Sequence, residues 1–565
     1  MTMTTIAGTV PPPAPPRRPS RTGRVVRAPL GLAGSVAAVL FSCASLTPSL
    51  LPRAWYLQGI VSGLTAAIGY GVGAGLGALV RLVWRRTYPR ATRIAWRVLL
   101  IAAPIAGLLM LALGTKWQQE LRARLDMERM ATYDIVRIVA VGALTFAALL
   151  LIARLLRLGA RLLARLLGRW VPRPIAYAAG FTVVAYLSIG FVNGFLLDNL
   201  LTVADRTASL TNGGTPEGVH MPGSALRSGS PASAAPWRTL GRQGREFVGT
   251  GPTVAQLTAF AGRPAREPIR LYAGLDSAAS AGARARLVVQ EMDRTGAFDR
   301  AVVGVVTPTG TGWVDRNVTD SLEYMYGGDT ALVSMQYSYL PSWISFLADR
   351  SKVSESAAAL IGAVHARWAA MPAANRPELL LFGESLGSFG TETAFADPAG
   401  LTSGADGVLL VGPPFANPIR QSLVAGRDAG SPVWNPAFSA SYPARAVEFA
   451  RQPADLRTRR GTPPAVVYLQ NSSDPIVWWT PALLFERPQW LDDPRGPDVS
   501  PDMHWYPLVT FWQTAVDQVI AIDVPAGHGH VYGSGVADGW AALAAPPGWT
   551  TNDTVRLRAL LDAPR

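Results

Sequence analysis

Residues 383–387 read Gly-Glu-Ser-Leu-Gly, a G-x-S-x-G pattern with Ser385 at its centre. A run typical of a buried strand, residues 378–382, comes directly before it, and a stretch compatible with a helix follows. A serine on such a sharp strand-to-helix turn has a positive φ, so the residues two before and two after it must be small. The turn exposes the hydroxyl and directs the next backbone N–H, that of Leu386, towards a developing oxyanion. The pattern therefore predicts a nucleophilic serine that forms an acyl-enzyme.

A serine hydroxyl is a weak nucleophile at neutral pH, so it needs an imidazole as general base and a carboxylate to orient that base. Asp474 comes just after the β-branched run 465–469. His528 and His530 come just after a second apolar run, 519–524, which we expect to be a strand. The order serine, acid, histidine is one of the known orders of a catalytic triad. We expect Asp474 to be the acid and favour His530 as the base, because its Gly-His step lies deeper in the loop, with His528 as the alternative.

Each of these side chains also has a simpler interpretation. Asp474 precedes a proline and could do no more than begin a turn. Asp523 is a second candidate acid, but it falls inside the predicted strand, where a structural role is expected. The histidine that is not the base would be its hydrogen-bond partner or a structural residue. No cluster of carboxylates or cysteines accompanies the H-x-H pair, so we predict neither a metal nor a cofactor. The remaining histidines lie in less suitable places: His220, His365 and His504.

Six short segments carry a resemblance that extends over nearly the whole chain. They are residues 48–53 (Pro-Ser-Leu-Leu-Pro-Arg), 244–248 (Gly-Arg-Glu-Phe-Val), 308–313 (Pro-Thr-Gly-Thr-Gly-Trp), 336–342 (Gln-Tyr-Ser-Tyr-Leu-Pro-Ser), 383–388 (Gly-Glu-Ser-Leu-Gly-Ser) and 527–532 (Gly-His-Gly-His-Val-Tyr). In these segments the sequence resembles a bacterial, mainly actinobacterial, family of membrane-anchored α/β-hydrolases with an N-terminal multi-span membrane domain. The resemblance implies an α/β-hydrolase catalytic domain with Ser385 as its nucleophile, and it implies no particular substrate.

The second half of the oxyanion hole is less clear from the sequence. The His-Gly loop that often supplies it in α/β-hydrolases is absent, and a Pro-Thr-Gly-Thr-Gly segment, residues 308–312, follows the predicted strand 301–306 instead. By its position, this segment could offer the backbone N–H groups of Thr309, Gly310 and Thr311. The competing interpretation is a glycine-rich turn without a catalytic part.

The composition indicates a membrane protein. The chain of 565 residues has only 16% charged residues, and its mean hydropathy is +0.20. The apolar segments lie in the first 201 residues, and each has about the 20 residues that cross a bilayer. The candidate spans are 29–51, 57–80, 95–114, 135–155 and 174–200. We therefore expect a disordered cytoplasmic leader (1–28), a transmembrane domain of about five helices (29–201), a flexible linker rich in Ser, Gly and Pro (202–240) and a catalytic domain (241–565).

Arginines indicate how these spans are oriented. They are concentrated before the first span and in the loops after the second and fourth spans. Basic residues favour the cytoplasmic side, so five spans place the catalytic half outside the plasma membrane. Residues 1–201 hold 23 Lys and Arg against 5 Asp and Glu, whereas the remainder holds 29 against 33. The catalytic half is therefore near neutral, which argues against nucleic acid as a partner.

Strand-like runs and helical patterns alternate in the catalytic half, which predicts an α/β-hydrolase domain with a mostly parallel sheet and helices on both faces. The predicted strands are 269–273, 301–306, 331–336, 378–382, 407–411, 465–469 and 519–524. Aromatic residues gather near the strand ends, either as ordinary core or as an acyl pocket or membrane contact: Trp313, Tyr337, Tyr339, Trp343, Trp478 and Trp479.

Together these patterns predict a membrane-anchored serine hydrolase that cleaves carboxylic esters of cell-envelope lipids. Its partners would be membrane lipids and a lipid or ester substrate at the membrane. One alternative is acyl transfer from the same acyl-enzyme to a hydroxyl group instead of water. Another is a transport or assembly module that carries a regulatory hydrolase-like domain. The intact order of Ser385, Asp474 and histidine argues against this last reading, as does the scarcity of ionisable residues within the spans.

Overall fold

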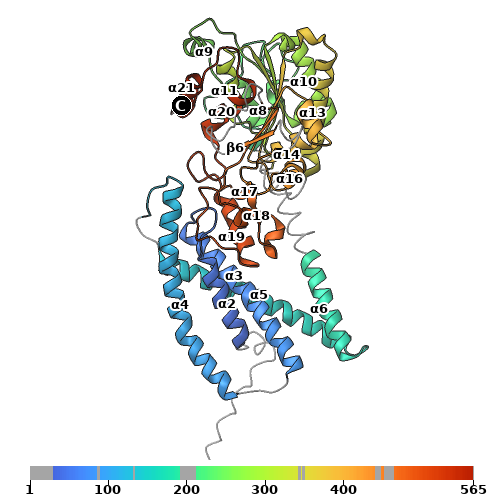
Figure 1. Cartoon of the computed structure of the whole chain (residues 1–565). Coiled ribbons are helices and arrows are strands. Elements are labelled where there is room, and N and C mark those ends of the chain that lie inside the picture. Colours follow the sequence, from blue (N-terminus) through green and yellow to red (C-terminus); the bar gives the residue numbers. More distant parts are fainter. Residues whose placement is uncertain are drawn as a thin grey trace, which may run out of the picture.

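The computed structural model describes residues 30–84, 89–130, 134–190, 211–340, 345, 350–439, 447–450 and 464–563. The predicted leader, the end of the fifth span and Trp343 lie outside the described residues. Two parts are stacked on one another in Figure 1: a bundle of helices below and an α/β domain above. We call residues 30–190 the N-terminal helical domain and the residues from 211 onward the α/β domain.

The N-terminal helical domain contains five described helices. They are α2 (Leu32–Ser45), α3 (Trp55–Val83), α4 (Pro89–Arg124), α5 (Ile135–Leu167) and α6 (Arg173–Gly190). Three of them, α3, α4 and α5, are long and apolar enough to cross a membrane, whereas α2 is apolar but has only 14 residues. Large apolar side chains such as Leu100, Ile105 and Val136 are exposed on their outer surfaces. Such a surface suits contact with lipid rather than water.

Small residues let α2 and α3 pack closely. A side chain at Gly69 of α3 would come within 2.7 Å of the Ala37 carbonyl oxygen of α2, and one at Gly73 would collide with the carbonyl of Ala33. The glycines of α3 therefore form the close-packing face that small residues provide between helices in lipid. The first helix is shorter than the predicted span 29–51, because the chain leaves it at Ser45 to form the loop 46–54.

In the described part of the α/β domain, seven strands form a parallel sheet in the order β1-β3-β2-β4-β5-β7-β6. The strands are β1 (Ile269–Ala273), β2 (Val302–Thr307), β3 (Thr330–Met335), β4 (Glu378–Glu384), β5 (Gly407–Val411), β6 (Val447–Ala450) and β7 (Val466–Leu469). Side chains of the central strands are buried on both faces of the sheet, as expected where helices cover a parallel sheet on both sides. The predicted fold class is confirmed.

Helices α10 and α13 cover one face of the sheet, and α8, α11, α20 and α21 cover the other. The helices of the domain are α8 (Gly241–Gly249), α9 (Val254–Ala261), α10 (Ala281–Thr295), α11 (Arg316–Met325), α13 (Arg350–Ala369), α14 (Leu386–Thr393), α15 (Pro398–Ser403), α16 (Pro418–Ala425), α17 (Pro475–Trp478), α18 (Gln489–Asp492), α19 (Val509–Asp517), α20 (Val536–Ala544) and α21 (Thr551–Leu561). This arrangement leaves the carboxyl ends of the strands for the loops that carry the predicted site residues.

One prediction about this half is wrong, and one strand was missed. Residues 519–524 do not form a strand, since residues 518–520 are a short 3-10 helix and a turn follows. Ile520 and Ala521 are buried below the sheet, not within it, and the neighbouring Val519 and Ile522 are exposed. The edge strand β6 was not predicted. A short apolar run is compatible with a strand or with buried irregular chain, and only the tertiary contacts decide between them.

The described part of the predicted flexible linker is packed against the sheet. The Ser228 backbone N–H donates to the Arg270 carbonyl at 3.1 Å, and the Arg270 N–H donates to the Leu226 carbonyl at 3.3 Å. The Ser228 hydroxyl also accepts from the Tyr272 N–H of β1 at 3.0 Å. Residues 211–240 therefore belong to the α/β domain and are not a free tether, despite a composition typical of linkers.

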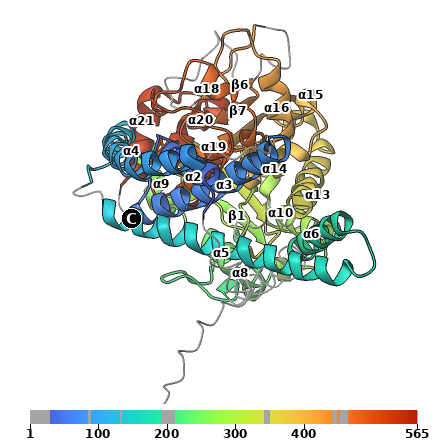
Figure 2. The same cartoon turned by 90° about the horizontal axis from the view of Figure 1, so that it is seen from below.

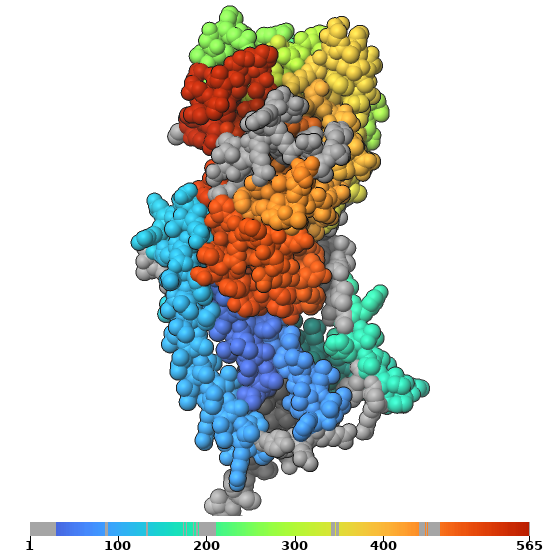
Figure 3. Space-filling view, viewed as in Figure 1, coloured from blue at the N-terminus to red at the C-terminus, as the bar shows by residue number. Residues whose placement is uncertain are grey.

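The two domains share a hydrophobic core, which we call the seam. Loop 46–54 and the end of α4 contribute Leu50, Leu51, Leu121 and Leu125, all fully buried. The region 475–521 of the α/β domain contributes the other side with Val477, Trp478, Leu483, Trp490, Leu491, Val499, Met503, Ile520 and Ala521. Figure 3 shows this region seated on α2 and α3, with α4 rising along its side, and Figure 2 shows α19 beside α2 and α3 from below.

A buried polar network links the two domains at the seam. Asp517 at the end of α19 accepts hydrogen bonds from the Arg53 Nε at 2.7 Å and from the Leu50 N–H at 3.1 Å, and both charged side chains are fully buried. The Arg53 guanidinium also donates to Gln58 at 3.2 Å, and the Arg53 N–H donates to Gln118 at 2.9 Å. The loop between α2 and α3 is therefore bound into the α/β domain by contacts that are more than 460 residues apart in sequence.

Candidate active site

Ser385 lies at the turn between β4 and α14, with φ 52° and ψ −124°. A side chain at Gly383 would collide with the carbonyl of Gly387, and one at Gly387 would collide with the carbonyl of Thr307 in β2. The two glycines of the motif are thus required by the close approach of strand, helix and neighbouring strand. Ser385 is one of few described non-glycine residues with a positive φ, and this strain is typical of a serine held for nucleophilic attack.

Asp474 follows β7 and begins α17. One carboxylate oxygen accepts from the Ile476 N–H at 2.8 Å, as in a helix cap. The other accepts from His530 Nδ1 at 2.7 Å and from the Tyr532 hydroxyl at 2.8 Å. Asp474 is fully buried, so these bonds fix the carboxylate in one orientation. An ionised carboxylate only accepts hydrogen bonds, so His530 carries its proton on Nδ1 and leaves Nε2 free to take another.

The Nε2 atom of His530 is buried and has no hydrogen-bond partner among the described residues. Its ring lies on Gly412, where an added side chain would collide with the imidazole. Gly412 follows Val411, whose carbonyl accepts the Ser385 N–H at 2.8 Å. The imidazole and the nucleophile turn therefore meet at the carboxyl end of β5.

Two carboxyl groups near the imidazole affect its basicity: Asp474 through its charge and hydrogen bond, and Glu384 only where it is ionised. Burial lowers the pKa of His530, but the charge and hydrogen bond of Asp474, with a contribution from Glu384, more than offset this, so the net pKa is raised above its usual value. Burial, together with the nearby Asp315, raises the pKa of Glu384 to about 8. Glu384 is therefore mostly a neutral acid at pH 7, directly before Ser385.

The other predicted histidine has a different environment. His528 Nε2 lies 3.3 Å from Asp126, just beyond α4, and Nδ1 lies 3.2 Å from the buried Asp498. Of the two candidates, His530 is thus the one that contacts Asp474, and His528 faces the N-terminal helical domain. The alternative acid Asp523 lies in the turn after residues 518–520, and the exposed His504 bonds to a backbone carbonyl.

The predicted oxyanion donors are partly engaged in other bonds. Leu386 is the first residue of α14, where backbone N–H groups have no acceptor within the helix. The Thr309 N–H instead donates to the Trp313 carbonyl at 3.0 Å, closing a turn. Gly310 and Thr311 lie in this turn, directly after the Thr307 and Pro308 carbonyls that abut the nucleophile motif. This loop therefore lies beside the turn of Ser385, but the Thr309 N–H is already hydrogen-bonded to the Trp313 carbonyl.

Sequence reasoning missed two residues that hold the loops of Asp474 and His530. The Tyr532 hydroxyl donates to Asp474 and accepts the Asn471 N–H at 3.2 Å. The Asn471 side chain in turn donates to the Gly529 carbonyl at 2.9 Å. Tyr532 comes two residues after His530 in the segment 527–532. This closeness in sequence was the one feature that could have identified Tyr532 as a neighbour of the site. Among the described residues no group of three or more His, Cys, Asp and Glu side chains is placed to hold a metal ion.

Comparison with known families agrees with this geometry. The model of the alpha/beta-hydrolase family matches residues 269–557, which include every strand of the sheet and the residues Ser385, Asp474 and His530. The chain belongs to the alpha/beta-hydrolase family. A second model, the N-terminus of the same family, matches residues 46–252, from loop 46–54 into the segment that packs beside β1. No curated protein and no solved structure matched the chain.

Proposed function

We propose that this alpha/beta-hydrolase is a serine hydrolase that cleaves carboxylic esters through an acyl-enzyme on Ser385. The observation that carries the proposal is the buried pair of Asp474 and His530, joined at 2.7 Å, whose Nε2 has no partner among the described residues and meets the turn of Ser385. A base held in one tautomer beside a strained serine is the arrangement that nucleophilic acyl transfer requires.

The steps follow from these groups. Ser385 Oγ attacks the ester carbonyl carbon while its proton passes to His530 Nε2, and the Leu386 N–H stabilises the oxyanion. The imidazolium, stabilised by Asp474, then gives this proton to the departing alcohol, which leaves an acyl-enzyme. Water attacks the acyl-enzyme in the same way, with His530 again accepting and returning the proton. The products are a carboxylic acid and free Ser385.

The substrate is proposed to be a lipid ester at the membrane. The loops that hold Asp474 and His530 continue into the seam, where Trp478 and Ile520 pack on the N-terminal helical domain. The candidate site is thus fixed close to helices that can cross a bilayer, on the side where lipids would arrive. The near-neutral α/β domain also suits an apolar acyl group better than a charged one.

The proposed location is the outer face of the plasma membrane. Arg81 lies in the last turn of α3, and Arg90 and Arg93 lie within the first five residues of α4. Figure 1 shows that the start of α4 is far from the α/β domain. Basic residues mark the cytoplasmic side, so the α/β domain would lie on the opposite side. Topology reporters fused at residue 565 test this, and a cytoplasmic signal would contradict it.

Labelling of membranes with a fluorophosphonate probe tests the chemistry. The probe should label the wild-type protein, and Ser385→Ala should abolish labelling while the protein remains folded in the membrane. If the probe still labels the Ser385→Ala protein, the nucleophile is a different residue. Analysis of the products from a lipid ester, with and without an added alcohol, separates hydrolysis from acyl transfer, because transfer produces a new ester.

A further inference from the structure

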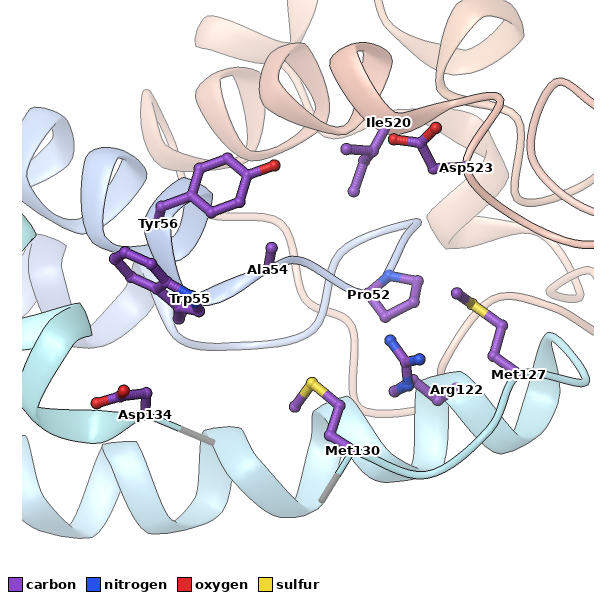
Figure 4. A pocket seen from close by; sticks show the side chains of 10 residues that line it. All are labelled: Pro52, Ala54, Trp55, Tyr56, Arg122, Met127, Met130, Asp134, Ile520 and Asp523. Atoms are coloured by element: carbon purple, nitrogen blue, oxygen red, sulfur yellow. The ribbon is translucent and has the colours of Figure 1, made fainter. Parts of the chain in front are cut away.

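A cavity lies at the seam, and Ser385 is not among the residues that line it. It has a volume of about 290 Å³, is partly open, and lies where the upper ends of α3, α4 and α5 meet the α/β domain. Figure 4 shows residues of all these elements around it, from Trp55 at the start of α3 to Ile520 and Asp523. The volume is at the small end of the range of ligand pockets, roughly 300–1,000 Å³. It suits a group the size of a lipid headgroup rather than a whole lipid.

The walls of this seam pocket are largely apolar, and its charged side chains are of both signs. Trp55 and Met130 form part of the apolar wall. The backbone N–H and carbonyl of Met130 are both hydrogen-bonded to the Gln119 side chain of α4. Arg122 supplies a guanidinium whose Nε bonds to the Glu128 carbonyl at 2.6 Å. Two carboxylates also line the pocket: Asp134, which already pairs with Arg137 at 2.9 Å, and Asp523, which lies on the opposite, α/β side from Arg122. A ligand that carries both a phosphate and an amine matches such a pair of charges.

The position of the pocket fits a lipid. Trp55 and Tyr56 begin a helix that can cross a membrane, and Tyr56 is exposed. Trp and Tyr at helix ends are typical of the boundary between bilayer and water. The exposed Ile60 of α3 and Val139 of α5 lie about one turn below, so an apolar surface continues from the pocket towards the bilayer. Acyl chains could lie on this surface while the headgroup enters the pocket.

We infer that the seam pocket binds the headgroup of an amine-bearing phospholipid, with its phosphate on Arg122 and its ammonium on Asp523. Binding would also support the candidate active site. Ile520 and Asp523 line the pocket, and the carbonyl of Ala521, which lies between them in sequence, accepts the His530 N–H at 2.7 Å. The lipid would therefore hold the segment to which the catalytic histidine is hydrogen-bonded. This second effect depends on the proposed function, whereas the binding itself does not.

The test uses the full-length protein in nanodiscs of phosphatidylcholine doped with phosphatidylethanolamine or phosphatidylglycerol. Native mass spectrometry counts the lipids retained after release. The wild type should retain phosphatidylethanolamine in preference to the other two lipids. Loss of one charge-assisted contact in Arg122→Gln or Asp523→Asn should weaken retention about tenfold, and Met130→Trp, which fills the pocket, should do the same. Arg124→Gln, which replaces an exposed arginine two residues further along α4, is the matched control and should retain lipid as the wild type does.

The outcomes separate the binding site from the proposed chemistry. Ser385→Ala should retain phosphatidylethanolamine as the wild type does, whether or not Ser385 is the nucleophile. Asp523 is exposed, so its replacement by asparagine should leave the melting temperature of the protein within about 1 °C of the wild type in phosphatidylcholine alone. Equal retention of all three lipids, or unchanged retention by Asp523→Asn and Met130→Trp, would overturn the inference.

Discussion

The buried ion pair of Arg53 and Asp517 offers the sharpest test of how the two domains are joined. Replacing Asp517 by asparagine keeps the shape of the side chain but removes its charge. Arg53 then loses a charged partner at 2.7 Å, and both side chains are fully buried, so water cannot take its place. The Leu50 and Leu51 N–H groups also lose a carboxylate acceptor, at 3.1 and 3.4 Å. Breaking a buried pair of this kind costs about 3–5 kcal/mol, because one charge remains buried without compensation.

The assay is thermal unfolding of the full-length protein, followed by the fluorescence of the seam tryptophans, which include Trp478 and Trp490. About 1 kcal/mol corresponds to roughly 2–4 °C in domains of 150–250 residues, so Asp517→Asn should lower the melting temperature by about 5 °C or more. The matched control is Asp492→Asn, whose partner Arg487 lies at 2.6 Å but is more than half exposed. An exposed pair contributes about 0–1 kcal/mol, so the control should melt close to the wild type.

Activity gives a second measurement of the same change. Helix α19 ends at Asp517, and the segment that holds His530 begins directly after it. Asp517→Asn should therefore lower turnover of a lipid ester as well as stability, while the protein still inserts in the membrane. A variant that melts within about 1 °C of the wild type, with unchanged turnover, would refute the view that this pair fastens the seam and supports the site.

Three further predictions concern the candidate site. Tyr532→Phe removes the hydroxyl that donates to Asp474 at 2.8 Å; turnover should fall about tenfold to a hundredfold. The acidic limb of its pH–rate profile should also move to higher pH, because a carboxylate without this bond raises the pKa of His530 further. His530→Ala should lower turnover by at least about a thousandfold, whereas His528→Ala should cost far less, and the opposite result would exchange their roles. Glu384 keeps its proton in the folded protein up to a pKa of about 8, against 4.5 as its ordinary value. The free energy of unfolding should therefore fall as pH rises from about 4.5 to about 8, and Glu384→Gln should remove this fall in pH-dependent denaturation curves.

Sequence patterns predicted the parts of the fold that depend on local order. Six of the seven predicted strands, and the strand–turn–helix around Ser385, follow from apolar runs and from small residues at fixed spacing. The pairing of Asp474 with His530 was also expected from chain order. Sequence favoured His530 over His528, and their actual partners differ because the chain between them reverses direction at Gly529, where φ is 50°.

What the sequence did not predict depends on contacts between distant segments. Leu50 and Leu51 look like the end of a lipid-facing span, but they are buried against the α/β domain. The run 519–524 looks like a strand, but it has no neighbour in the sheet and instead completes the seam. Residues 211–240 have the composition of a linker, but their backbone bonds to β1. Hydrophobicity and composition indicate that a segment is buried, but they do not indicate which other segment it packs against. That information comes only from the assembled fold.

The packed linker and the seam change how substrate selection is understood. A flexible tether would have let the α/β domain sample a shell of solvent above the bilayer, and its preference for lipid would have come only from proximity. The packed seam instead places the Asp474 and His530 loops at one height and orientation relative to α2, α3 and α4. On the proposed function, the ester group must then reach Ser385 at that fixed height, so the distance from the membrane surface to Ser385 selects which part of a lipid is cleaved. Selectivity would come from where along the lipid the ester lies, more than from the affinity of an acyl pocket.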